Sequence, residues 1–310
     1  MKRILVTPRS ITAAGGHPAL ERLRESGYEV VLSTAGMLPN ESDLSRLLPG
    51  CVGYLAGIEK VSRNVLHAAS DLKVISRNGV GTDGIDLDAA REFKIKVCNA
   101  PGSNARGVAE LALAFVFSAA RSIAFSDSMI KEEQWTRKMG SELKGKTLGV
   151  IGCGRIGKEL SLMALAIGMK VIAFEPGSQV FFTYDDRFSY ASLDAVTSES
   201  DFISLHCPPP ANGKPVVDKS FLSKMKAGSS IINTARGELI NEDDLLAALN
   251  NGVLASYATD VYLEEPPFSS RLFRHENVIC TAHIGGYTTE SVDRAVEDAV
   301  NNILKTLCDE

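Results

Sequence analysis

Apolar residues along the chain gather in short runs that alternate with stretches in which they recur at helical spacing. In the first hundred residues the short runs occupy positions 2–7, 29–33, 52–56, 72–77 and 95–99. Between them, residues 18–26 and 61–69 repeat apolar side chains with the period of a helix. Because parallel strands are joined by long crossover connections, usually helices, this alternation predicts a parallel α/β sheet.

A second series of the same kind begins near residue 147. Its predicted strands lie at 147–152, 170–175, 202–206, 229–234, 255–260 and 278–283, and one helical stretch from 103 to about 134 links the two series. A last helix, at about 288–307, carries an apolar stripe formed by Val292, Ala295, Val296, Ala299 and Ile303. We therefore expect two doubly wound α/β domains around a cleft, one from residues 1–100 with 285–310 and the other from 101–284.

Composition and charge narrow the class of protein. The 310 residues, 45% of them hydrophobic and 23% charged, suit a globular chain of two domains. A net charge of −5 argues against a nucleic-acid partner. We expect no signal peptide, because the apolar stretch that follows Met1-Lys2-Arg3 is far too short. We also expect no membrane partner, because the most apolar segment, 108–120, is too short to span a bilayer. An apolar helix of this length is typical of a domain or subunit interface, so segment 108–120 predicts a homodimer that pairs through the second domain.

The cysteines indicate the chemical environment. The chain has six of them, without a CxxC pair or a cluster that resembles a metal site. We therefore expect no bound metal and a reduced, cytoplasmic protein.

A glycine-rich turn follows the predicted strand at 147–152. In the pattern Gly152-Cys153-Gly154-Arg155-Ile156-Gly157, the first glycine permits the tight turn, the second leaves room for a pyrophosphate, and the third lets the next helix pack closely. The phosphates would lie at the helix N-terminus, where free N–H groups favour an anion. Glu175 ends the following strand, where a carboxylate binds the adenosine ribose and repels a 2′-phosphate. The pattern favours NAD over NADP.

Three predicted strand ends in the second series carry ionisable side chains of complementary types, namely Arg236, Glu265 and His283. They can converge, because the carboxyl ends of parallel strands border the ligand site. A histidine can exchange the proton of a hydroxyl that becomes a carbonyl, and a carboxylate beside it stabilises the imidazolium. An arginine can hold a substrate carboxylate through two parallel hydrogen bonds. The set predicts hydride transfer between NAD and a 2-hydroxy acid.

These motifs, read in order, resemble one enzyme family. Together with 205–208, 233–237, 265–267 and 283–286, they make the chain similar to the D-isomer-specific 2-hydroxyacid dehydrogenases over essentially its full length. The resemblance implies a flavodoxin-like substrate domain and a Rossmann NAD domain. It also implies that Arg236 binds substrate and that His283 is the acid/base with Glu265 as its partner. The further cofactor contacts that it implies are Arg155, Ile156, His206, Cys207, Pro208, Thr234, Ala235, Asp260, Gly285 and Gly286.

A second glycine-rich turn follows the predicted strand at 72–77. Its backbone N–H groups can bind a carboxylate. In the resembling family this loop belongs to the substrate domain. We therefore expect substrate contacts from Arg77, Asn78, Gly79 and Val80.

The substrate itself is less clearly indicated. The motifs are most similar to those of family members that act on 3-phosphoglycerate, so we expect this chain to convert 3-phosphoglycerate to 3-phosphohydroxypyruvate. Lys60, Arg77 and the pair Arg137-Lys138 could bind the phosphate. Some members carry an arginine where this chain has residues 55–58, which weakens the case for a phosphorylated acid. The alternatives are a hydroxypyruvate or glyoxylate reductase, which needs less positive charge, and a non-enzymatic NAD-sensing protein on the same scaffold.

Overall fold

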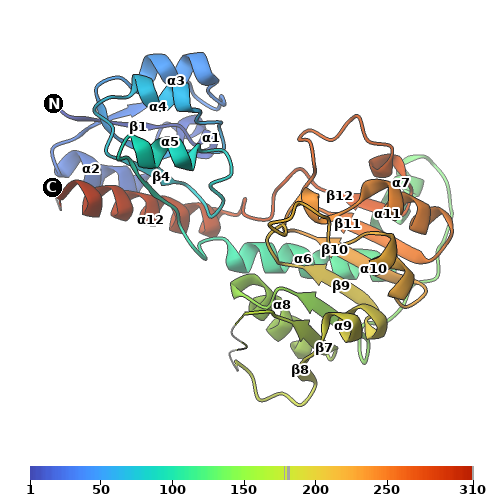
Figure 1. The fold of residues 1–310 in the computed structure, drawn as a ribbon. Coiled ribbons are helices and arrows are strands. Elements are labelled where there is room, and N and C mark those ends of the chain that lie inside the picture. Colours follow the sequence, from blue (N-terminus) through green and yellow to red (C-terminus); the bar gives the residue numbers. More distant parts are fainter. Residues whose placement is uncertain (178, 180–181, 309–310) are drawn as a thin grey trace. The chain divides into compact units, whose positions relative to one another are not determined.

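The computed structural model describes residues 1–177, 179 and 182–308, and the chain divides into two compact units (Figure 1). The first unit contains Met1–Asn104 and Gly286–Glu310, and the second contains Ala105–Gly285. The sequence pattern placed these divisions at residues 100 and 284. Because the chain crosses between the units twice, its last helix belongs to the same unit as its first strand.

The sheet of the first unit has five parallel strands in the order β2-β1-β3-β4-β5. This is the flavodoxin-like order of a doubly wound sheet. The strands are β1 (Arg3–Val6), β2 (Glu29–Leu32), β3 (Cys51–Ala56), β4 (Val74–Arg77) and β5 (Lys96–Cys98).

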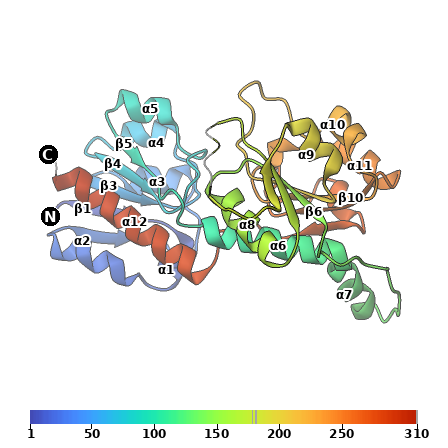
Figure 2. The same cartoon turned by 90° about the horizontal axis from the view of Figure 1, so that it is seen from below.

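Helices cover both faces of this first sheet. One face packs against α3 (Glu41–Leu47), α4 (Arg63–Ala68) and α5 (Leu87–Glu92), and the other against α1 (Arg9–Ala13), η1 (Pro18–Leu20), α2 (Glu21–Glu25) and α12 (Thr289–Cys308). Figure 2 shows α12 lying along this sheet. A Cβ on Gly53 would lie 3.3 Å from Ile303, so this glycine lets α12 approach β3 closely. The predicted stripe on α12 is confirmed, with Val296, Ala299 and Ile303 fully buried.

The sheet of the second unit has seven parallel strands in the order β12-β11-β10-β9-β6-β7-β8. Counted within the unit, this is the Rossmann order 3-2-1-4-5-6 with a seventh strand at one edge. The expectation of two doubly wound parallel sheets is therefore confirmed. The strands are β6 (Thr147–Ile151), β7 (Lys170–Phe174), β8 (Phe188–Tyr190), β9 (Phe202–Leu205), β10 (Ser229–Asn233), β11 (Leu254–Thr259) and β12 (Val278–Cys280).

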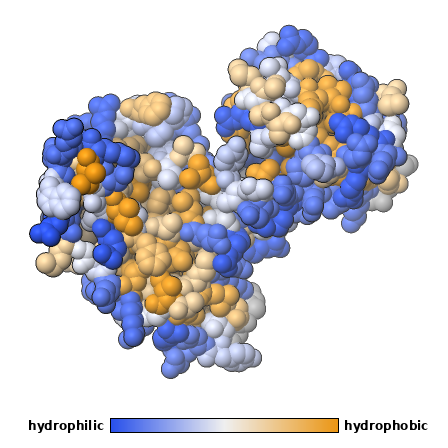
Figure 3. Space-filling model, turned by 180° about the vertical axis from the view of Figure 1, so that it is seen from behind, coloured by the Kyte–Doolittle hydropathy of each residue, from blue (hydrophilic) through white to orange (hydrophobic). Residues whose placement is uncertain are grey.

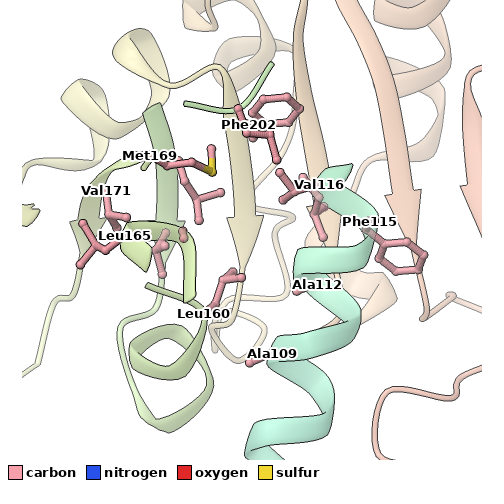
Figure 4. Close-up of a cluster of buried hydrophobic side chains, with 14 of the residues drawn as sticks. Ala109, Ala112, Phe115, Val116, Leu160, Leu165, Met169, Val171 and Phe202 are labelled. Carbon is pink, nitrogen blue, oxygen red and sulfur yellow. The ribbon is translucent and has the colours of Figure 1, made fainter. Parts of the chain in front are cut away.

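Two helical layers enclose the second sheet. One layer contains α6 (Ala105–Arg121) and α8 (Arg155–Ala166), whose side chains Ala112, Val116, Leu160 and Leu165 meet over the strands (Figure 4). The opposite layer contains α9 (Leu193–Glu199), α10 (Lys219–Lys224) and α11 (Glu242–Asn250), with short 3-10 turns at Gly237–Leu239 and Leu272–Arg274. The layers leave the strand ends open, and the loops there carry the candidate site.

The prediction of one continuous helix from residue 103 to about 134 is wrong, because the structure has two helices there. The helix α6 ends at Arg121, Ser122 adopts a left-handed backbone with φ of 49°, and α7 (Ile123–Lys131) starts in a new direction. Within the described residues no single helix is long and apolar enough to cross a membrane. The bent pair α6 and α7 meets those criteria by length and composition alone, with a bend of 66°.

Candidate active site

The glycine-rich turn after β6 has the geometry that the sequence pattern requires. Gly152 adopts φ of 94°, and a Cβ there would lie 2.6 Å from the carbonyl carbon of His206. A Cβ on Gly157 would strike the carbonyl oxygen of Gly152. Gly154, in contrast, has no atom within 4 Å of the place where its Cβ would be. The first and third glycines therefore allow close backbone packing, and the second leaves open space at the N-terminus of α8, next to Arg155 and Ile156.

Glu175 lies beside this turn. Its Oε2 accepts a hydrogen bond from the Cys153 backbone N–H at 2.9 Å, and its Oε1 accepts one from the Gly177 N–H at 2.9 Å. The turn and the end of β7 are also joined by a backbone bond from Gly152 N to the Phe174 carbonyl. A carboxylate is thus fixed at the position where the Rossmann pattern predicts contact with a ribose.

Two polar atoms at the neighbouring strand ends are shielded from solvent and have no partner among the described residues. They are Nδ1 of His206, which follows β9 together with Cys207 and Pro208, and Oγ1 of Thr234, which follows β10 with Ala235. The other ring nitrogen of His206 lies 2.9 Å from the Ser204 hydroxyl. Burial lowers the pKa of His206 to about 4, so its ring is neutral at pH 7. Shielded atoms without partners suit the polar groups of a bound nucleotide.

The loop that presents Arg236 is shaped by Asn233, a fully buried residue at the end of β10. The Asn233 side chain donates to the Arg236 carbonyl at 2.8 Å and accepts from the Ala235 N–H at 3.0 Å. A Cβ on Gly237 would strike the backbone of Tyr262, so the loop passes directly against the segment that follows β11. The sequence reasoning assigned no role to Asn233, although an asparagine before a turn is a known signal for such bonds.

Asp260 holds the segment that carries His283. Asp260 is 2% exposed, and its Oδ1 accepts from the Thr281 hydroxyl at 2.6 Å and from the Ile284 N–H at 2.7 Å. Its Oδ2 accepts from the Gly285 N–H at 2.7 Å. The three bonds bracket His283, whose backbone is left-handed with φ of 54°. Thr281 has a positioning role that the sequence reasoning missed.

His283 and Glu265 are brought together. The imidazole Nδ1 lies 2.9 Å from Oε1 and 3.0 Å from Oε2 of the carboxylate. The two side chains are 53% and 42% exposed, so a small molecule can reach them. Since Nδ1 is bound by Glu265, Nε2 is the ring nitrogen that can serve a substrate. Arg236 lies at the end of the adjacent strand, where its guanidinium donates to the Ala235 carbonyl at 2.7 Å.

The predicted substrate loop lies in the first unit, after β4. The Asn78 N–H donates to the Ala56 carbonyl at 2.9 Å, and the guanidinium of Arg77 donates to the Asn78 carbonyl. Among the hydrogen bonds of the described residues, none uses the N–H of Val80 or of Gly81. Gly79 supplies a φ of 140° to the turn. Two backbone N–H groups without a partner among the described residues are therefore available to a carboxylate.

One predicted cofactor residue, Gly286, lies outside the second unit. Gly286 belongs to the first unit, where a Cβ would lie 3.1 Å from the Asn104 side chain, so its expected cofactor contact stays a prediction. The described residues contain no group of three or more potential metal ligands. The geometry thus consists of a dinucleotide turn, an Asp260-anchored histidine with its carboxylate, and a separate amide-rich loop.

The comparisons with known proteins bear on the same regions. Residues 113–285 match the model of the D-isomer specific 2-hydroxyacid dehydrogenase, NAD binding domain. A hydroxypyruvate reductase of Thermotoga maritima is 39% identical over 273 residues, which cover 86% of this chain and 88% of the reductase. The chain belongs to the D-isomer specific 2-hydroxyacid dehydrogenases. As a member of this family it is an NAD-dependent oxidoreductase that acts on a small 2-hydroxy or 2-oxo acid.

Other relatives of this dehydrogenase differ in length from it, so the aligned part is a different share of each relative. A D-3-phosphoglycerate dehydrogenase of Archaeoglobus fulgidus is 36% identical over 93% of this chain, which spans only 56% of that protein. The crystal structure of the TT0316 protein from Thermus thermophilus has a TM-score of 0.89 at 32% identity, covering 99% of this chain and 97% of that one. A NAD+-bound 3-phosphoglycerate dehydrogenase of Entamoeba histolytica gives 0.82 at 28% identity, with 99% and 95% covered.

Proposed function

We propose that this dehydrogenase interconverts a D-2-hydroxy acid and its 2-oxo acid through proton exchange at His283. The observation that carries the proposal is the pair of contacts, at 2.9 and 3.0 Å, between the imidazole Nδ1 and the Glu265 carboxylate. The carboxylate fixes the tautomer and stabilises the imidazolium, so Nε2 can donate a proton to the oxygen on C2 in reduction and take it back in oxidation.

The remaining residues would bind and orient the reactants. Arg236 would hold the substrate carboxylate and polarise the C2 oxygen. The loop of Arg77, Asn78, Gly79 and Val80 would contact the acid, with the free N–H groups of Val80 and the following Gly81 as donors. Bound NAD supplies or accepts the hydride. It would be held by the turn from Gly152 to Gly157 and by Glu175, and at the neighbouring strand ends by His206, Cys207, Pro208, Thr234, Ala235, Gly285 and Gly286. Asp260 would act on this part of the site indirectly, through the backbone of Ile284 and Gly285.

For the substrate we propose hydroxypyruvate, an acid without a phosphate. Lys138, one of the expected phosphate-binding cations, is engaged within its own unit, with Asn277 at 2.8 Å, Glu276 at 3.3 Å and the Phe125 ring centroid at 3.8 Å. The segment at 55–58 contains no cation, and the residue that follows it is the buried Glu59. The similarity to the Thermotoga maritima reductase over most of both chains supports the same choice.

The second candidate is 3-phosphoglycerate, with a role in serine biosynthesis. It is favoured by the similarity to phosphoglycerate dehydrogenases, one of them 42% identical over 79% of this chain. Lys60 is exposed in the first unit and could contact a phosphate there. Glyoxylate is included as the shortest unphosphorylated acid.

The test measures the oxidation of NADH in the presence of each of four 2-oxo acids: hydroxypyruvate, glyoxylate, pyruvate and 3-phosphohydroxypyruvate. The reverse reaction is measured with 3-phosphoglycerate and NAD. We expect hydroxypyruvate to give the highest kcat/KM. His283→Ala should abolish turnover of every acid while NAD binding, measured by calorimetry, is retained. Unchanged turnover in that variant would refute the role of His283, and activity confined to the phosphorylated acids would refute the choice of substrate.

We also propose a homodimer and a cytoplasmic location. Figure 3 shows apolar side chains gathered over one face of the second unit. The exposed large apolar residues of α6, α7 and the segment after them are Phe117, Ile123, Ile130, Trp135 and Met139. Pairing of two copies would remove such side chains from water. All six cysteines are free thiols, which suits a reducing compartment. Analytical ultracentrifugation that finds only monomer at micromolar concentration would contradict the dimer.

A further inference from the structure

A buried carboxylate, Glu59, lies in the first unit and directly precedes Lys60 in the sequence. Glu59 is 3% exposed, and its Oε1 accepts three hydrogen bonds, from the Thr7 hydroxyl, from the Tyr54 hydroxyl and from the Gly57 N–H at 2.7 Å. Thr7 and Tyr54 are themselves fully buried. Its Oε2 is shielded from solvent and has no partner among the described residues.

The cluster adjoins the loop that we propose binds the substrate. Gly57 directly follows β3, whose last residue, Ala56, accepts the hydrogen bond from the Asn78 N–H at 2.9 Å. Further along, the Val61 N–H donates to the Gly84 carbonyl at 2.8 Å, so the loop after β3 runs beside the loop after β4. Glu59 is therefore held at the same edge of the sheet as the free amides of Val80 and Gly81.

The donors around Glu59 form a seat for an anion. Two hydroxyls and one backbone N–H converge on a single oxygen, a combination that also binds phosphate and carboxylate ligands. Burial, followed by the nearby charge of Glu59, raises the pKa of Tyr54 well above its usual range, so this hydroxyl stays protonated as a donor. The chain fills the seat with its own side chain.

Gly57 is the residue that allows this arrangement. A Cβ at this position would lie 2.6 Å from Oε2 of Glu59 and 3.2 Å from the Cα of Pro8. Any other residue would push the carboxylate out of the seat. The two hydroxyls and the Gly57 N–H thus bind the Glu59 carboxylate, and the missing side chain of Gly57 leaves the space for it.

We propose that Glu59 is a specificity-determining residue that excludes phosphorylated acids from this dehydrogenase. The proposal rests on the substrate role of the loop after β4. The donors that could hold a substrate phosphate are already occupied by Glu59, and the charge of this buried carboxylate repels a second anion that approaches the loop after β4. An acid with a neutral C3 hydroxyl does not meet this repulsion, whereas its phosphate ester does.

The test uses Glu59→Gln, which keeps the shape of the side chain and one acceptor oxygen for the three donors but removes the charge. The ratio of kcat/KM for 3-phosphohydroxypyruvate to that for hydroxypyruvate should rise about tenfold. This is the change expected when one partly screened repulsion between two negative charges is removed. Glu25→Gln removes the same charge from an exposed position on α2 and should leave the ratio unchanged. Glu59→Asp, which retains the charge, should also keep the preference against phosphate.

Several results would overturn the proposal. One is a ratio in Glu59→Gln equal to that of the wild type. Another is a wild-type enzyme that prefers 3-phosphohydroxypyruvate, a result that needs no variant to fold. If the enzyme turns over none of the acids, the proposed function is refuted, but the inference about Glu59 can still be tested. The measurement is then a thermal shift assay with inorganic phosphate. Phosphate should then raise the melting temperature of Glu59→Gln more than that of the wild type, and equal shifts would contradict the inference.

Discussion

We predict that Asp260→Asn slows turnover by releasing the backbone around His283. The carboxylate accepts bonds from Thr281, Ile284 and Gly285, all between 2.6 and 2.7 Å, and it is almost fully buried. Asparagine has one acceptor oxygen in place of two. The orientation that keeps two of the three bonds turns the amide –NH2 group toward the Gly285 N–H, so two donors face each other there.

The cost of this change follows from the lost contact. Loss of a hydrogen bond to a charged group, together with a buried N–H left without an acceptor, costs about 3 kcal/mol. The left-handed backbone of His283, with φ of 54°, is disfavoured by roughly 1–2 kcal/mol for a residue with a side chain, so the freed segment relaxes away from it. If the whole loss falls on this segment, the population with His283 in place drops about 100-fold, since each factor of ten corresponds to about 1.4 kcal/mol.

The assay is steady-state reduction of hydroxypyruvate, together with urea unfolding at pH 7. We expect kcat to fall by about 100-fold while the KM for NADH changes little. Thr281→Val is the matched control, because it removes one donor and keeps both backbone bonds, and its loss should be about tenfold or less. A rise in the KM for NADH with kcat retained would place Asp260 at the cofactor instead, and kcat within about threefold of wild type would refute the positioning argument.

Three further changes test the rest of the site. Glu265→Gln removes the negative charge beside His283 but keeps an acceptor, so kcat should fall about tenfold with the KM for NADH unchanged, and a kcat equal to wild type would contradict the pairing. Glu175→Ala removes the charge that repels a 2′-phosphate, so kcat/KM with NADPH relative to NADH should rise about tenfold, and an unaltered ratio would remove Glu175 from the ribose site. The pKa of His206 is about 4 in the folded protein and 6.5 in the unfolded chain, so below pH 6.5 the unfolded chain binds an additional proton and the free energy of unfolding falls. The decrease should be at most about 1.4 kcal/mol per pH unit down to pH 4, and His206→Asn should reduce this slope in urea titrations at pH 7, 6 and 5.

Short helices are the elements that the apolar pattern did not predict. The helices α3, α5, α9, α10 and α11 have six to nine residues, too few for a clear period. Each begins after a residue whose side chain accepts a hydrogen bond from a backbone N–H three positions on: Asn40, Asp86, Ser192, Asp218 and Asn241. A search for such N-caps would have located them from the sequence. The three-residue strand β8 and the break at Ser122 carry no comparable signal.

The sequence by itself determined the fold class and the chemical groups available. Strand and helix periods depend on neighbouring residues, and the turn from Gly152 to Gly157 combines local backbone requirements with close packing, so both are visible in one chain. The order of Arg236, Glu265 and His283 along the chain likewise pointed to hydride transfer with NAD. Their roles in catalysis stay predictions until the variants are measured.

Only the tertiary structure decided which groups meet. The sequence resemblance paired Glu265 with His283, but the atoms that face each other, both carboxylate oxygens on Nδ1, depend on the ends of β11 and β12. The apolar pattern of the sequence did not indicate that Asp260 binds the backbone of residues 284 and 285. It also did not indicate that Glu59 folds back onto Thr7. Such contacts join segments far apart along the chain, and local periodicity constrains neither their distance nor their direction, so they follow from how strands and loops pack.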